Sequence, residues 1–425
     1  MIKVNDINVP QLRFKEFDGK WNEKKYGQIF SFFSTNSFSR DKLNYEKGNV
    51  RNIHYGDIHT KFETMFHLLN EEVPFINEDV DISRIKEECY CQEGDLVIAD
   101  ASEDYSDIGK TIELINLNNE KVLAGLHTFL ARPNKQDVAK GFSGYLVQSW
   151  KVRKQVMTIA QGTKVLGLAT SRLGKIKINL PSLPEQQKIA QFLTAVDSKL
   201  LQLTQKKELL AQYKKGVMQQ LFSQQLRFKQ DDGSDYPHWE EKRLGEIADR
   251  ISTKNTSNEV NFVLTNSATQ GVVSQQEYFD KEIANQNNLE GYYIVSKDDF
   301  VYNPRISASA PVGPIKRNKL QKGVMSPLYS IFRFKESLLE YFEHYFETTN
   351  WHKYLHSVAN FGARHDRMNI TNSDFFKMPI PMPTYDERKK IANYLSAIDT
   401  KIETVTQQIE ATQQFKKGLL QQMFV

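Results

Sequence analysis

Two glycine-containing basic loops are the places where side chains of this chain could contact a nucleic acid. They read Gln161-Gly162-Thr163-Lys164 and Phe361-Gly362-Ala363-Arg364, and each lies upstream of a proline that introduces a long helical pattern. Arg, Lys, Asn and His contact phosphates and base edges, and Arg and Asn form bidentate pairs with guanine and adenine. Any single side chain of this kind is more often solvated or paired in an internal salt bridge than bound to DNA. The prediction is therefore that these regions contact DNA, and not that each residue does. The candidate contacts are Asn36, Arg40, His54, Lys164, Arg305, Arg364 and Arg367.

No constellation of residues has the spacing of a catalytic or metal centre. Gly109-Lys110-Thr111 resembles the end of a phosphate-binding loop, but the glycine required five residues earlier is Asp104. The acidic residues between positions 100 and 107 lack EF-hand spacing and fit a turn or a helix cap. Cys89 and Cys91 have no second Cys or His pair at zinc spacing nearby. We therefore expect a non-catalytic chain that holds no metal and no cofactor of its own.

The size and composition indicate a folded protein of two or more domains. The chain has 425 residues, of which 25% are charged and 40% hydrophobic, and its net charge is +4. A single hydrophobic core rarely serves so long a chain. No secretory leader pattern and no run of eighteen apolar residues occurs, so a cytoplasmic location is expected. The weak positive charge permits a polyanionic partner without requiring one.

The elements that must position the loops are duplicated. Residues 188–222 align without a gap onto residues 390–424, at a constant offset of 202, with about half of the positions identical. A weaker match links the heads of the two halves, where Leu12-Arg13-Phe14-Lys15 corresponds to Leu226-Arg227-Phe228-Lys229. The middles, roughly 30–180 and 250–380, give no convincing alignment. We interpret the chain as a constant framework around two variable middles that do different jobs.

Both copies of the repeat carry a seven-residue spacing of apolar residues, which is typical of a coiled-coil seam. Pro184-Glu185-Gln186 and Tyr385-Asp386-Glu387 fit helix starts, and each helix would span about 40 residues, or roughly 60 Å. Lys207, Lys214 and Lys416 interrupt the seam. An antiparallel pair of these helices would return the chain and make it pseudo-twofold; one large helical core or a homodimer seam is the alternative. The predicted seam consists of Ile189, Leu193, Val196, Leu200, Leu203 and Leu210, with Ile391, Leu395, Ile398, Ile402, Val405 and Ile409.

The variable middles read as mixed α/β (α+β), with strand-like runs such as 95–99 and 299–302 bounded by turn-forming residues. The expected architecture is two globular recognition domains joined by two long helices that form an antiparallel coiled coil. The boundaries are 1–180 for the first domain, 181–225 for the first helix, 226–380 for the second domain and 381–425 for the second helix.

The helix entry and the doubled framework together resemble a known family. Residues 184–190 read Pro-Glu-Gln-Gln-Lys-Ile-Ala, whereas the second copy has Arg388 in place of the glutamine. With a tryptophan-led head before each variable domain, the whole chain resembles the specificity (S) subunit of type I restriction-modification systems.

The resemblance implies that each domain reads one half of a bipartite DNA target, while the helices set the gap and dock modification subunits. It also implies two modification (methyltransferase) subunits that use S-adenosylmethionine to methylate adenine at N6, and two restriction (endonuclease and translocase) subunits that use ATP and Mg. The chemistry would then belong to the partners, and the chain itself would be no enzyme. A non-enzymatic coiled-coil scaffold protein and a stand-alone DNA-binding regulator are the alternatives.

A change in helix length tests the spacer role. Inserting or deleting seven residues near Leu203 should change the tolerated gap between half-sites, because seven residues of helix rise by about 10 Å. The half-sites themselves should stay the same in a map of methylated sites. If both half-sites changed instead, the helices would not act as a spacer.

Overall fold

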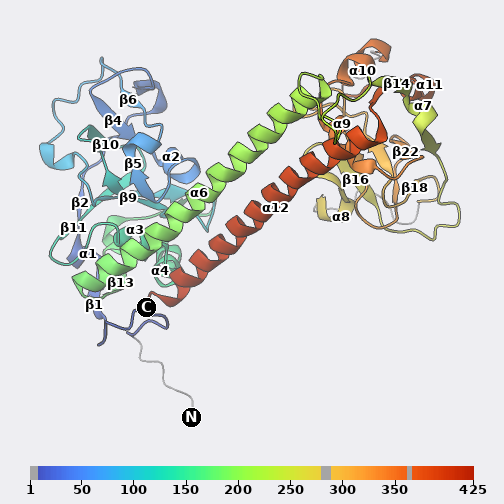
Figure 1. The fold of residues 1–425 in the computed structure, drawn as a ribbon. Coiled ribbons are helices and arrows are strands. Elements are labelled where there is room, and N and C mark those ends of the chain that lie inside the picture. Colours follow the sequence, from blue (N-terminus) through green and yellow to red (C-terminus); the bar gives the residue numbers. More distant parts are fainter. Residues whose placement is uncertain (1–7, 279–288, 361–365) are drawn as a thin grey trace. The chain divides into compact units, whose positions relative to one another are not determined.

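The computed structural model describes residues 8–278, 289–360 and 366–425, which form two compact units. Unit 1 consists of residues 1–204 with 407–425, and unit 2 consists of residues 205–406. Each unit therefore holds one globular domain and one half of each long helix, α6 (Leu183–Phe222) and α12 (Tyr385–Gln422), which are the two longest ribbons in Figure 1. No helix of the described residues is long and apolar enough to span a bilayer.

The core of unit 1 is a five-stranded sheet with the order β2-β11-β7-β9-β5. Its central strand has the sequence Leu-Val-Ile-Ala and is buried along its whole length, which suits its β-branched and apolar residues. Only the β5–β9 pairing is parallel. The strands are β2 (Phe30–Phe33), β5 (Met65–His67), β7 (Leu96–Ala99), β9 (Thr111–Asn116) and β11 (Thr128–Pro133).

A second sheet and short helices complete unit 1. The sheet has the order β10-β4-β6-β3, and the pair β1–β13 joins the head of the domain to its end. The strands are β1 (Asn22–Lys25), β3 (Leu43–Asn44), β4 (Val50–Ile53), β6 (Phe75–Ile76), β10 (Lys121–Ala124) and β13 (Lys177–Leu180). The helices are α1 (Tyr26–Ile29), α2 (Tyr55–Thr60), α3 (Ser143–Gln148), α4 (Trp150–Ile159) and α5 (Thr170–Leu173).

Unit 2 is built on the same core sheet, although the sequences of the two middles do not align. Its strands run in the order β15-β22-β19-β20, all antiparallel, as β2-β11-β7-β9 do in unit 1. A buried strand needs apolar residues of suitable shape and not particular ones, so this likeness is invisible in residue identities. The strands are β15 (Ala248–Ile251), β19 (Phe300–Tyr302), β20 (Ile315–Arg317) and β22 (Ser330–Phe334).

The remaining elements of unit 2 again include a pair that joins the head of the domain to its end, β14–β23. The further strands are β14 (Glu240–Arg243), β16 (Leu264–Ser267), β17 (Gly271–Ser274), β18 (Tyr293–Val295), β21 (Gly323–Met325) and β23 (Pro379–Met382). The helices are α7 (Leu244–Ile247), α8 (Gln275–Tyr278), α9 (Leu339–Glu347), α10 (His352–Val358) and α11 (Asn372–Phe376).

In each unit the beginning of one long helix packs against the end of the other, as an antiparallel pair requires. In unit 1, Ile189 and Leu193 share a core with Leu419 and Met423. In unit 2, Val217 and Leu221 share a core with Ile391 and Leu395. Every predicted seam residue is buried or half-buried. Their part in setting a spacing remains a prediction.

Two of the lysines that interrupt the seam form ion pairs between the helices. Lys214 on α6 contacts Asp399 on α12 in unit 2, and Lys416 on α12 contacts Asp197 on α6 in unit 1, at 2.6 and 2.7 Å. The four positions obey the offset of 202. Lys214 also contacts Glu347 on α9, at 2.7 Å, and so ties the recognition domain of unit 2 to both helices.

The two lysines should differ in their effect on stability. Lys214 is 11% exposed and holds two carboxylates, whereas Lys416 is 22% exposed and holds one. We expect Lys214→Met to lower the free energy of unfolding by about 1–3 kcal/mol, since it removes the ammonium group that two partly buried carboxylates share. Lys416→Met should cost about 1 kcal/mol or less. Urea titration of both variants checks the order, and equal losses would contradict it.

Each head is anchored to its helix by a buried carboxylate. Glu185, at the start of α6, accepts from the Nε and Nη2 atoms of Arg13, both at 2.7 Å, and from the Trp21 indole at 3.3 Å. Glu387, at the start of α12, accepts from Arg227 at 3.0 and 2.8 Å and from Trp239 at 3.0 Å. The second contact repeats the first.

Arg388 occupies the position of Gln186 in the second copy of the repeat and keeps part of the contact that Gln186 makes. The Gln186 amide donates to the Pro181 carbonyl at 3.0 Å, and the Arg388 guanidinium donates to the Pro383 carbonyl at 3.1 Å. Arg388 then adds an ion pair with Glu336 at 2.6 Å. The substitution therefore keeps the helix start and changes only which neighbour it holds.

Candidate nucleic-acid interface

In unit 1 the predicted basic loop meets the segment that follows the central strand β7. There, β8 (Ala101–Ser102) pairs with β12 (Leu166–Gly167), and the Leu168 amide donates to the Asp100 carbonyl at 2.8 Å. Lys164 is exposed in the turn before β12, next to Val165, which is 53% exposed. Gly162 has φ +137° and the Val165 carbonyl lies 2.0 Å from where its Cβ would stand, so this turn requires glycine.

Unit 2 has the same arrangement after its central strand β19. Arg305 forms a β-bridge with Arg367, and the Met368 amide donates to the Pro304 carbonyl at 2.9 Å. The structure thus brings together two predicted residues that lie far apart in the sequence. Arg305 is exposed and Arg367 is 31% exposed. Arg364 lies outside the described residues.

The first three candidates lie beside α2 in unit 1, and internal contacts occupy two of them. Asn36 donates to the Asn52 side chain and to the Ala124 carbonyl, and its Oδ1 accepts from the Phe38 amide. His54 is 7% exposed and its Nδ1 accepts from the Gly56 amide at 3.2 Å. The amide of Asn36 and the Nδ1 atom of His54 thus already have partners within the protein.

Arg40 remains available for a ligand, although it forms an ion pair. Its guanidinium lies 2.7 Å from the buried Asp57 carboxylate, yet 45% of the side chain is exposed. Burial lowers the pKa of the neighbouring His54, and the charge of Arg40 lowers it further. His54 thus favours its neutral form beside Arg40.

His127 was not predicted from the sequence, but it lies against α2, beside which the three candidates are found. His127 is 51% exposed, lies 3.3 Å from the Asp100 carboxylate and packs edge-on against the Tyr55 ring. Its φ of +54° places it in a tight turn between β10 and β11. No pattern in the sequence marks this residue, since the contacts that place it come from three separate segments.

Unit 2 contains a pocket of 470 Å³ beside the Arg305–Arg367 bridge. Arg250 on β15 and Arg367 supply its positive charge, while Asn369 and Asn372 supply amide groups. Leu328, which is 58% exposed, and Tyr329 supply apolar surface. Guanidinium groups can bind phosphates, and guanidinium and amide groups can hydrogen-bond to base edges. Arg250 and the two asparagines were missed, and only the asparagines lie near a predicted residue in the sequence.

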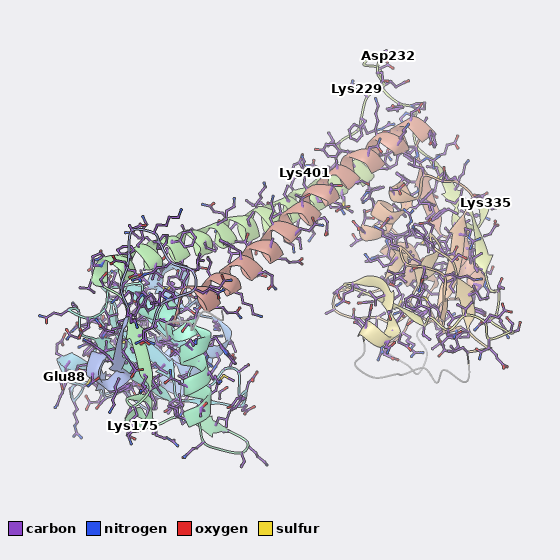
Figure 2. The ribbon with its side chains drawn as sticks, turned by 90° about the horizontal axis from the view of Figure 1, so that it is seen from below. Glu88, Lys175, Lys229, Asp232, Lys335 and Lys401 are labelled. Carbon is purple, nitrogen blue, oxygen red and sulfur yellow. The ribbon has the colours of Figure 1, made fainter. Side chains whose placement is uncertain are left out.

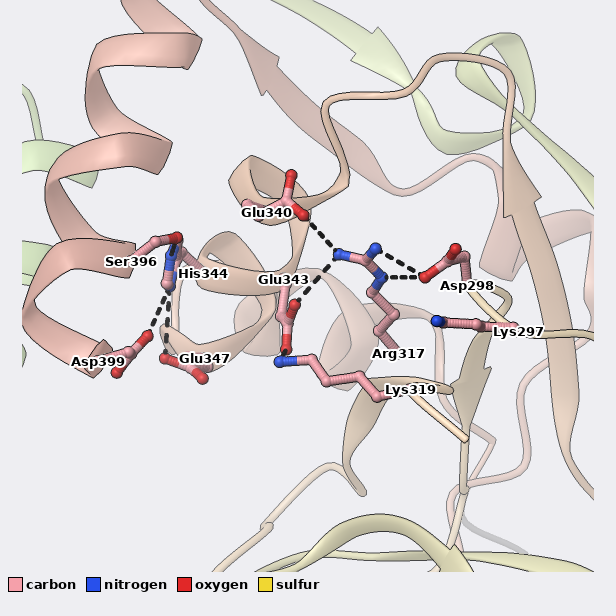
Figure 3. A pocket seen from close by; sticks show the side chains of 10 residues that line it. All are labelled: Lys297, Asp298, Arg317, Lys319, Glu340, Glu343, His344, Glu347, Ser396 and Asp399. Carbon is pink, nitrogen blue, oxygen red and sulfur yellow. Dashed lines mark hydrogen bonds and ion pairs between the residues drawn. The ribbon is translucent and has the colours of Figure 1, made fainter. Parts of the chain in front are cut away.

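A second pocket of unit 2, of 540 Å³, has the wrong charge for DNA (Figure 3). Five carboxylates line it against three basic side chains, so it would repel phosphates. Arg317 pairs there with Asp298 and Glu340, at 2.7 and 2.9 Å. The lining residues are Lys297, Asp298, Arg317, Lys319, Glu340, Glu343, His344, Glu347, Ser396 and Asp399.

Part of this second pocket is the counterpart of a junction in unit 1. His344 on α9 contacts the Ser396 hydroxyl at 3.1 Å and lies 3.8 Å from Asp399. Tyr145 on α3 contacts Thr194 and Asp197, which are the positions equivalent to Ser396 and Asp399. Both units thus fasten the recognition domain to a long helix through the same pair of helix positions.

The rejected catalytic motifs have structural roles in the described residues. The Lys110 ammonium of the Gly109-Lys110-Thr111 segment donates to the His59 carbonyl at 2.7 Å. Cys89 and Cys91 are free thiols, and burial raises the pKa of Cys91 strongly. Within residues 8–278, 289–360 and 366–425, no group of His, Cys, Asp and Glu side chains is arranged to hold a metal ion.

One buried acid in unit 1 gives a test by pH. Burial raises the pKa of Glu113 to about 7, against the opposing effect of the Gly141 and Gly144 amides, which donate to its carboxylate at 2.5 and 2.6 Å. The folded protein therefore holds a proton that the unfolded chain releases near pH 4.5. Stability from this group is present below that pH and is lost as pH rises to about 7.

We expect Glu113→Gln to flatten this part of the stability profile. The wild type should lose at most about 3 kcal/mol between pH 4.5 and 7 through Glu113. The variant keeps one acceptor for the two amides and no longer titrates. Thermal unfolding at pH 5 and pH 8 measures the difference, and identical pH dependence of the two proteins would contradict the prediction.

The comparisons with known proteins identify the family. Residues 18–211 and 237–413 each match the model of the type I restriction modification DNA specificity domain, and together they cover most of the chain. The chain belongs to this family of type I restriction-modification specificity subunits. The two matches correspond to the two halves of the internal repeat.

Relatives and solved structures agree with the family. The putative type I restriction enzyme MjaX specificity subunit of Methanocaldococcus jannaschii is 26% identical over 322 residues, which cover 71% of each chain. The MjaVIII specificity subunit of the same organism is 25% identical over 297 residues, covering 65% of this chain and 68% of the relative. The crystal structure of the S subunit of the type I system from M. genitalium matches with a TM-score of 0.56 at 12% identity, covering 98% of this chain and 99% of that one. That likeness shows the shared fold.

Proposed function

We propose that this specificity subunit reads a bipartite DNA target for a complex with two modification subunits and two restriction subunits. The modification subunits would methylate adenine at N6 with S-adenosylmethionine, and the restriction subunits would use ATP and Mg to translocate and cleave DNA. The subunit itself would supply recognition and no chemistry. Its place would be the cytoplasm, where the DNA is.

The observation that carries this proposal is the repeated placement of basic loops on a repeated sheet. In each unit, the segment after the central strand pairs with residues that follow a predicted basic loop in the sequence, Leu166 and Gly167 in unit 1 and Arg367 in unit 2. Two equivalent surfaces, built from different side chains, are what two different half-sites require. Tethering both in one chain converts the second binding event into an intramolecular one and so strengthens it.

The proposed contacts are the exposed or half-buried basic residues of these surfaces. In unit 1 they are Arg40, His127 and Lys164, and in unit 2 they are Arg250, Arg305 and Arg367. Asn36 is left out because its amide is already hydrogen-bonded within the protein, and His54 because it is buried. Contacts of this kind release counterions, so binding should weaken steeply as salt is raised.

Co-expression with the modification subunit of its own system tests the proposal. Genomic DNA from cells that carry both genes would be sequenced for methyladenine. A split motif with a constant unread gap supports the proposal and reveals both half-sites. A soluble complex without new methylation would favour a scaffold, and specific DNA binding that needs no partner would favour a stand-alone regulator.

A further inference from the structure

An extended segment of unit 2 lines the 470 Å³ pocket with side chains that alternate in exposure. Met368 is buried, whereas its neighbour Arg367 is half-buried and its neighbour Asn369 is exposed. Side chains two residues apart in an extended segment point to the same face. The Met368 amide donates to the Pro304 carbonyl, and the Asn369 carbonyl accepts from the Asn360 amide, both at 2.9 Å. These backbone hydrogen bonds fix where Asn369 stands beside Arg367.

The side-chain amide of Asn369 is available to a ligand. It is exposed and forms no hydrogen bond with any residue that the structure describes. An asparagine amide carries a donor and an acceptor side by side. In the major groove, adenine presents the complementary pair, with a donor at its N6 amino group and an acceptor at N7. The chemistry of Asn369 therefore fits the edge of adenine.

Leu328 adds apolar surface to the same pocket from the turn between β21 and β22, and its side chain is 58% exposed. The Leu328 and Tyr329 amides donate to the Ser326 hydroxyl and carbonyl, at 3.4 and 3.1 Å, and so hold this turn. A single exposed leucine is ordinary on a protein surface. This one, however, shares its pocket with Arg250 and Arg367, whose charge attracts the DNA backbone. The apolar group that a base pair presents in the major groove is the 5-methyl group of thymine.

The amide and the leucine match the two bases of one pair, since adenine and thymine lie opposite each other. We propose that unit 2 reads one A·T base pair in the major groove, with Asn369 hydrogen-bonded to N6 and N7 of adenine and Leu328 in contact with the 5-methyl group of thymine. Arg250 and Arg367 would bind the DNA beside this pair. The adenine is not the one that becomes methylated, because Asn369 would cover its N6 atom. This inference rests on the proposed function and assigns part of its specificity to two side chains.

Removal of a single methyl group from the DNA tests the leucine contact. The specificity subunit, purified with its modification subunit, is titrated with duplexes in which each thymine of the motif is replaced in turn by uracil, which lacks only the 5-methyl group. One replacement should weaken wild-type binding about fourfold, the factor for burying one such group. Leu328→Ala should bind the thymine and uracil duplexes equally at that position. Leu328→Met keeps an apolar side chain and should retain the difference.

The adenine of the same base pair tests the amide contact. Its replacement by 7-deazaadenine removes the N7 acceptor and should weaken wild-type binding about fivefold, the factor for one hydrogen bond. Asn369→Ala should bind the two duplexes equally. Leu209→Ala is the matched control, since it changes a leucine of α6 that is 65% exposed and lies outside the pocket, and it should keep both differences. Unchanged thermal midpoints would show that each variant is folded.

The outcomes distinguish this inference from the proposed function. Wild-type binding that ignores every uracil, or a folded Leu328→Ala variant that responds to each uracil as the wild type does, would overturn the inference. So would a response to 7-deazaadenine that persists in Asn369→Ala. Specific binding to the motif would leave the proposed function intact in all three cases. If the wild-type complex bound no DNA sequence specifically, the proposed function would fail and this inference with it.

Discussion

Arg227→Ala is expected to lower the free energy of unfolding by about 3–5 kcal/mol, because it leaves a buried carboxylate without its charge partner. Glu387 is fully buried, and the guanidinium of Arg227 supplies two of its hydrogen bonds. Only the Trp239 indole would remain. Urea titration followed by tryptophan fluorescence gives the change directly.

Two comparisons decide whether the loss arises from the unpaired charge. Lys242→Ala changes an exposed residue of β14 and should leave the stability unchanged. The double variant Arg227→Met with Glu387→Leu removes both charges and should recover most of the loss. A double variant as unstable as Arg227→Ala would show that the ion pair is not the cause. Arg13→Ala should behave in unit 1 as Arg227→Ala does in unit 2, since Glu185 has the same contacts.

Arg367→Ala is expected to weaken binding to target DNA by about 1–3 kcal/mol, or roughly 5- to 150-fold, and to relax the motif within one half-site only. Arg367 joins the loop after β19 through its bridge with Arg305 and lines the basic pocket of unit 2. The half-site read by unit 1 should stay unchanged. Sequencing of methyladenine after co-expression with the modification subunit measures both halves at once.

Lys335→Ala provides the matched control for this experiment. Lys335 is an exposed basic residue that directly follows β22 (Figure 2). Ser330, which lines the pocket, lies at the other end of that strand. Its replacement should change neither half of the motif. An Arg367 variant with an unaltered motif and unaltered affinity would remove the pocket from the DNA surface, and changes in both halves would mean that the two units do not read independently.

The long helices could be predicted closely because their signal is local. A seven-residue apolar spacing and an acidic start with proline nearby are properties of adjacent residues, and the observed helices begin at Leu183 and Tyr385. The antiparallel pairing followed from the repeat. The sequence of one helix could not explain why Lys214 and Lys416 interrupt the seam, because their partners, Asp399 and Asp197, lie on the other helix.

The candidate site could be predicted only as regions. The loops around Lys164, Arg305 and Arg367 were found by composition, and the structure brings the last two together. Asn36 has a suitable side chain, but its amide is hydrogen-bonded to Asn52 and Ala124, which are distant in the sequence. His127 and Arg250 carried no sequence signal, because only the sheet places them beside the predicted residues.

By itself, the sequence determined the duplicated framework, the two helices and the family resemblance, since all three reside in the order of neighbouring residues. Only the tertiary structure decided that the two middles share one core sheet and which basic side chains are exposed. The physical reason is that a buried strand tolerates many apolar sequences, whereas hydrogen bonds and ion pairs between distant residues decide which polar groups are already used.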